Sequence, residues 1–146
     1  MSLIAATVTL AAATLAAAAP LPVHSVDLEH RSNAYKVDYR ARVTTSTRTI
    51  GISPPARQST QRCIMTATVT VERVIADGSH QLVAALPRQE TFTRQLPGDC
   101  RSRKGQLADL VEDKRSAIGA HLAATAAEDR PQALAAIDAA HHFAAN

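Results

Sequence analysis

The sequence predicts an α+β fold, in which an antiparallel meander of about four strands precedes a C-terminal pair of helices, with one disulfide bond. Three observations support this fold. Apolar and polar residues alternate through the first half of the chain, as in half-buried strands. After Cys100 the spacing of apolar residues becomes helical. The chain has two cysteines and 146 residues, a length that suits one domain.

Residues 1–18 are predicted to be a secretory signal peptide. The stretch from Leu3 to Ala19 is uncharged, and its small residues allow cleavage after Ala18. No Lys or Arg precedes Leu3, although signal peptides usually begin with positive charge. The alternative is an uncleaved membrane anchor, but Ala and Thr favour insertion less than Leu, Ile, Phe or Val. We therefore expect a bacterial protein that is exported to the periplasm or secreted.

Residues 19–33 show no clear period, and we interpret them as an extended lead-in to one α+β domain over residues 34–146. The domain begins with a strand in which apolar residues from Tyr35 to Val43 alternate with charged ones. We expect this strand to continue through residues 44–52 and to end at Ser53-Pro54-Pro55, because proline cannot donate a ladder hydrogen bond.

Three further strands are predicted. The second runs from about Cys63 to Ala76, with apolar residues on one face and threonines on the other. Asp77-Gly78 is a strong hairpin signal, after which the third strand covers about residues 80–86. A weaker fourth strand, residues 90–96, lies between two prolines.

Two helices are predicted after the strands. The first runs from about Ser102 to Ala126, and the second ends near Phe143. Asp129 suits the N-cap of the second helix, and Pro131 suits its first turn. The apolar face of the first helix comprises Leu107, Leu110, Val111, Ile118 and Leu122.

Cys63 and Cys100 are expected to pair with each other, because exported proteins fold where thiols oxidise. The bridge would close a loop of about 38 residues and stabilise the domain by about 4 kcal/mol. It would connect the second strand to the segment before the first helix. Free thiols and intermolecular bridges are the alternatives.

The sequence offers no catalytic motif. It lacks G-x-S-x-G, a glycine-rich phosphate loop and C-x-x-C. Its net charge of +3 is small for a protein that binds nucleic acid. We therefore expect a non-enzymatic binding or structural module, with no cofactor, no nucleic-acid partner and no integral membrane span in the mature protein.

Two groups of basic residues are candidates for binding anions, such as an anionic component of the cell envelope. One lies on the outward face of the first strand, and the other at the start of the first helix, where cations oppose the helix dipole. For the strand, the alternative is that charge protects the sheet from aggregation. The candidate residues are Arg40, Arg42, Arg48, Arg101, Arg103 and Lys104.

The alternative function is a small periplasmic hydrolase or a metal-dependent enzyme. Asp138 and His142 are four residues apart on one helix face, and His121 would supply a third ligand for zinc or copper. Against this, histidines in the last turn of a helix are often simply solvated, and their positive form suits the helix dipole.

Overall fold

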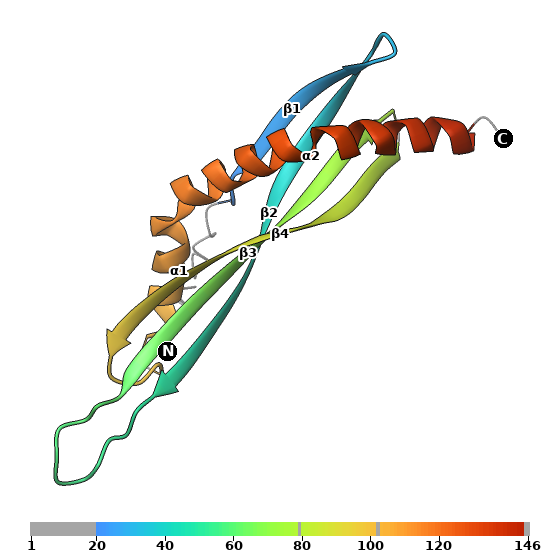
Figure 1. The fold of residues 1–146 in the computed structure, drawn as a ribbon. Helices are drawn as coiled ribbons and strands as arrows, with labels where there is room; N and C mark the ends of the chain where they lie inside the picture. The colour runs from blue at the N-terminus through green and yellow to red at the C-terminus, as the bar shows by residue number, and fades with distance from the viewer. Residues whose placement is uncertain (1–19, 79, 102, 145–146) are drawn as a thin grey trace, which may run out of the picture.

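A four-stranded antiparallel sheet and two helices make up the structure, a computed structural model that describes residues 20–78, 80–101 and 103–144. The helices lie across one face of the long, twisted sheet (Figure 1). The predicted meander, helix pair and disulfide are therefore confirmed. In sheet order the strands are β1 (Val23–His30), β2 (Asn33–Ile50), β3 (Arg62–Asp77) and β4 (His80–Pro97), and the helices are α1 (Lys104–Asp113) and α2 (Arg115–Ala144).

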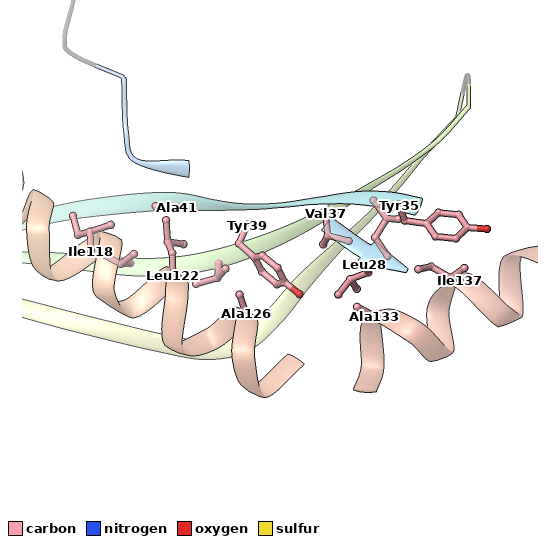
Figure 2. Packing of buried hydrophobic residues seen from close by; sticks show 13 residues of the cluster. Leu28, Tyr35, Val37, Tyr39, Ala41, Ile118, Leu122, Ala126, Ala133 and Ile137 are labelled. Carbon is pink, nitrogen blue, oxygen red and sulfur yellow. The ribbon is translucent and has the colours of Figure 1, made fainter. Parts of the chain in front are cut away.

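The larger part of the core lies between the sheet and α2. Alternate residues of β2 and β3 point toward the helix, as the sequence predicts. Figure 2 shows these side chains meeting those of α2. Fully buried members include Val37, Tyr39, Val69, Ile118, Leu122 and Ile137.

The smaller part of the core lies under α1. Leu110 packs there on Cys63, Met65 and Ala67 of β3. The chain leaves the helical path at Lys114, so that α1 and α2 each follow a different part of the sheet. The break between the helices is therefore at residue 114, and the expectation of one helix over residues 102–126 is wrong.

Strand β1 occupies the segment expected to be a lead-in. It pairs with β2 from Val23↔Arg40 to His30↔Asn33. Inward and outward positions alternate along β1, as expected of a strand with one buried face, but histidines occupy two of the inward positions, residues 24 and 30. These polar residues hide the period of two from a search for apolar alternation.

Strand β4 is continuous where two strands were expected. Leu86 lies opposite Val71 and Gln89 lies opposite Thr70, so the two residues between them form a bulge. One of these is Pro87. A proline is tolerated at this position because β4 is an edge strand and a bulge needs no ladder donor.

Pro131 lies inside α2 and does not begin a helix. A proline leaves one helical carbonyl without its usual donor, but the surrounding helix packs firmly on the sheet. Asp129 is not an N-cap, because its carboxylate is turned into the core toward Arg73. The predicted start of a second helix at Asp129 is therefore wrong.

A buried ion pair joins β3 to the middle of α2. One terminal nitrogen of Arg73 donates to both carboxylate oxygens of Asp129, at 2.9 and 2.8 Å. The hydroxyl of Tyr39 donates to the same carboxylate at 3.1 Å. Both charged side chains are only 9% exposed, so each depends on the other for its charge to be tolerated.

We predict that Asp129→Ala lowers the free energy of unfolding by about 3–5 kcal/mol, because it leaves the Arg73 charge buried without a partner. Urea denaturation measures this loss. The double variant Arg73→Met/Asp129→Leu removes both charges and should retain most of the stability. A loss below about 1 kcal/mol in the single variant would contradict the importance of the pair.

Burial, and secondarily the negative charge of Asp129, raises the pKa of Tyr39 from 10.0 to about 12. The neutral hydroxyl therefore contributes stability that is complete below pH 10 and is lost as the pH rises toward 12. The chain has two tyrosines, so the phenolate absorbance of Tyr35→Phe reports Tyr39 alone. We expect ionisation near pH 12 or together with unfolding. Ionisation near pH 10 in folded protein would contradict the assignment.

Candidate anion-binding site at the disulfide end

The predicted Cys63–Cys100 disulfide is present, with Cα atoms 4.9 Å apart. Cys63 lies near the start of β3 and is fully buried. The backbone N–H of Cys100 also donates to the Thr49 hydroxyl, near the end of β2, at 3.1 Å. The bridge and this hydrogen bond hold three distant segments of the chain together.

Each of these three residues has an arginine as its chain neighbour: Arg48, Arg62 and Arg101. All three arginines are exposed. In the β2–β3 register, Arg48 lies opposite Ile64 and Arg62 lies opposite Ile50, which makes the two arginines diagonal neighbours on the outer face. The disulfide thus holds the backbone beside Arg101 at the end of the sheet that carries Arg48 and Arg62, although Cys63 and Thr49 lie on the inner face and these two arginines on the outer face.

The segment before α1 is held against the sheet beside them. Gly98 donates its N–H to the carbonyl of Gln61 at 2.8 Å. The Arg103 guanidinium donates to the carbonyl of Pro97 at 2.5 Å, so it turns back on this segment. No side chain caps the start of α1 at Arg103, and Lys104 is the first helical residue. Arg103 therefore has a structural contact, whereas Arg101 is exposed.

The β2–β3 connection (residues 51–61) extends beyond the end of the sheet and carries Arg57 (Figure 1). It starts at Gly51, whose φ of +86° favours glycine and where a Cβ would lie 2.5 Å from the Thr60 carbonyl oxygen. The Thr60 N–H donates to the Ile52 carbonyl at 2.9 Å, which closes the base of the connection.

We define the disulfide end as Arg48, Arg57, Arg62 and Arg101 together with the β2–β3 connection. No acidic residue occurs between Asp38 and Glu72 in the sequence, although five arginines do. The nearest carboxylate in the segment before α1 is Asp99, which accepts the backbone N–H of Arg101 at 2.9 Å. The disulfide end is therefore strongly cationic.

Arg40 and Arg42 do not belong to this site. Arg42 pairs with Glu72 across the sheet, and the hydrogen bond to this carboxylate raises the pKa of the guanidinium. Arg40 lies 3.5 Å from the carboxylate of Asp38. The pKa of Asp38 is lowered, chiefly by a hydrogen bond from Ser25. In the outward row predicted from the sequence, Arg40 and Arg42 therefore have carboxylate partners. Arg48 is exposed, and no ion pair of this arginine is seen among the described residues.

The opposite end of the molecule holds two of the metal candidates. Asp138 and His142 line a cavity of about 650 Å³ between α2 and the β1–β2 turn. Asp138 already pairs with His30 at 2.8 Å and with Arg31 at 3.0 Å. The hydrogen bond from His30, more than the charge of Arg31, holds the pKa of Asp138 below its usual range.

His121, the third predicted metal ligand, lies far from Asp138 and His142. It precedes Asp138 by 17 residues on the same helix, which separates them by about 26 Å. Its Nδ1 lies 3.2 Å from a carboxylate oxygen of Glu90 on β4. Within residues 20–78, 80–101 and 103–144, no three His, Cys, Asp or Glu side chains are placed to hold a metal ion. The predicted three-residue site is not assembled.

The protein was compared with protein-family models, curated proteins and solved structures. None of the three comparisons gives a match. Of the helices in the described part of the chain, none has both the length and the apolar character needed to cross a bilayer. The predicted signal peptide, residues 1–18, lies outside the described residues.

Several residues of structural or electrostatic importance were not predicted. Arg73 occupies an inward position of β3 and His30 an inward position of β1, so each interrupts an apolar face. Their acidic partners, Asp129 and Asp138, come from α2. The absence of acidic residues between Asp38 and Glu72 is visible in the sequence and could have identified the cationic end.

We predict that Cys63→Ala/Cys100→Ala loses about 4 kcal/mol of unfolding free energy, because the loop between the cysteines becomes unrestrained in the unfolded state. Urea denaturation of the oxidised protein and of this variant measures the difference. Wild-type protein under reducing conditions should behave like the variant. Equal stability of the oxidised and reduced wild type would contradict a stabilising role for the bridge.

Proposed function

We propose that this is an exported, non-enzymatic module that binds anionic groups of a cell-envelope component through the disulfide end. The observation that carries the proposal is that Arg48, Arg62 and Arg101 are the chain neighbours of Thr49, Cys63 and Cys100, which a hydrogen bond and the disulfide hold together at one end of the sheet. Arginine suits this role because its planar guanidinium matches phosphate and carboxylate groups with two parallel hydrogen bonds.

The distribution of ion pairs supports this surface over the rest of the sheet. Arg40, Arg42, Arg73, Arg88 and Arg94 each have a carboxylate partner. Among the interactions of the described residues, no such ion pair involves Arg48, Arg57, Arg62 or Arg101. A ligand phosphate or carboxylate could therefore bind these guanidinium groups without first displacing a protein carboxylate.

Two features support action in the periplasm or at the cell surface. The apolar stretch from Leu3 to Ala19 has the composition of a secretory signal. The disulfide bond is of the kind that persists in oxidising compartments and is rare in the cytosol. The site would then face the anionic groups of the envelope.

A hydrolase or metal-dependent enzyme is the second candidate function, and the cavity beside Asp138 favours it. An imidazole bonded to a carboxylate, as His30 is to Asp138, is an arrangement used in general base catalysis. Tyr35 and His141 also share a hydrogen bond of 2.6 Å there. The cavity is at the C-terminal end of α2, however, and the carboxylate of Asp138 is already engaged by His30 and Arg31. We therefore favour the binding function.

We predict that Arg48→Gln/Arg62→Gln weakens binding to heparin, used as a polyanion probe, by at least about tenfold. Each arginine near an anionic surface contributes about 1 kcal/mol. The matched control is Lys36→Gln/Arg130→Gln, which removes the same charge from exposed positions elsewhere. Affinity is measured by titration at low salt, since salt screens such contacts.

The control variant should bind within about twofold of the wild type. Equal weakening of both double variants would mean that net charge alone attracts the polyanion. That result, or no binding by the wild type, would contradict a site at the disulfide end.

A further inference from the structure

The β2–β3 connection carries exposed aliphatic side chains among its arginines. Ile52 is 68% exposed and Ile50 is 38% exposed. One exposed isoleucine on a surface is ordinary, but here two lie close together at the end of the molecule that projects furthest from α2 (Figure 1). Nothing among the described residues buries the side chain of Ile52.

The structure holds Ile52 in a defined position. Its carbonyl accepts the Thr60 N–H at 2.9 Å, and its own N–H donates to the Thr60 hydroxyl at 3.3 Å. Gly51 makes the turn before it, and Pro54-Pro55 stiffens the chain after it. Because the backbone is already ordered, less conformational entropy is lost when this side chain is buried in a partner.

Arginines lie beside these isoleucines. In the β2–β3 register Arg62 lies directly opposite Ile50, and Arg48 lies two residues before Ile50 on the same face of β2. Arg57 follows Ile52 in the same connection, and this connection contains no acidic residue. An anionic surface would therefore attract this end of the molecule.

Resting on the proposed function, we infer that the disulfide end docks on a membrane surface with anionic headgroups. The arginines bind headgroup phosphates, and Ile52 enters the boundary between headgroups and acyl chains. A lipid surface explains both the cationic and the apolar side chains. Anionic headgroups attract arginines, and the boundary with the acyl chains accepts an aliphatic side chain. A soluble acidic polysaccharide would explain the arginines alone.

The test is co-sedimentation of the full chain with vesicles of 70% phosphatidylcholine and 30% phosphatidylglycerol, a mixture that represents roughly the charge of an anionic leaflet. Vesicles of pure phosphatidylcholine are the lipid control. Ile52→Ser should weaken binding to the anionic vesicles by about tenfold, since it removes the inserted aliphatic side chain. Phe143→Ser is the matched protein control, because Phe143 is 81% exposed at the opposite end of the molecule. The apolar residues 3–19 are common to all variants, so they cannot account for a difference between variants.

A second measurement does not depend on loss of binding. The chain contains no tryptophan, so Ile52→Trp introduces a single fluorescent reporter at the site. Its emission should shift to shorter wavelength with anionic vesicles, whereas that of Phe143→Trp should not. An unchanged emission from Ile52→Trp would overturn the inference.

The outcomes separate the inference from the proposed function. Wild-type protein that binds heparin but not the anionic vesicles would overturn the membrane inference and leave the anion-binding function standing, with a polysaccharide as the partner. Binding of Ile52→Ser equal to that of the wild type would also overturn the inference. Failure to bind either heparin or vesicles would overturn both.

Discussion

The disulfide between Cys63 and Cys100 is the constraint on which the rest of this description depends. It connects the fully buried Cys63, near the start of β3, to the segment that precedes α1. Through it α1 is held over the smaller part of the core, where Leu110 covers Cys63, Met65 and Ala67. The same covalent bond holds the segment that carries Arg101 against the end of the sheet where β2 and β3 carry Arg48 and Arg62. One constraint therefore contributes to stability and to the arrangement of the proposed binding surface.

The remainder of the fold depends on how α2 is fixed to the sheet. A single helical layer covers one face of long strands, and two of the buried residues of α2, Ala126 and Ala133, are alanines, which bury little area. The ion pair between Arg73 and Asp129, with the Tyr39 hydroxyl, adds a directional link at the middle of the helix. Near its C-terminus, Asp138 and His141 link α2 to the β1–β2 region. On the described part of the sheet, Arg48 and Arg62 at the disulfide end are exposed arginines for which no carboxylate partner is seen.

Much of the fold could be predicted from local patterns, because these patterns reflect what faces the core. Alternation along β2 and β3, the Asp77-Gly78 hairpin and the cysteine pair all correspond to the structure. Two of the errors have a common cause, which is that a residue distant in the sequence pairs with a polar residue that breaks the local pattern. Inward His30 finds Asp138, and Asp129 turns to Arg73 instead of capping a helix. Pro87 is accommodated by a bulge on an edge strand.

The sequence suggested Arg48 and Arg101 as members of two separate basic groups. That their segments meet at one end of the sheet depends on the disulfide and on the hydrogen bond to Thr49, which join residues far apart in the chain. Their role in anion binding stays a prediction. The sequence alone could not show that Arg40 and Arg42 lie outside the candidate site, because their carboxylate partners are set by strand register and by contacts along the strand.

The most direct test of this account is to map the amide NMR shifts of oxidised protein during titration with a heparin fragment, and to repeat the titration after reduction. We expect shifts in residues 48–62 and 99–103 together in the oxidised protein, and loss of the second group from the response after reduction. Shifts centred on residues 30–35 and 138–142, or a response that reduction leaves unchanged, would contradict the central claim that the disulfide assembles the binding surface.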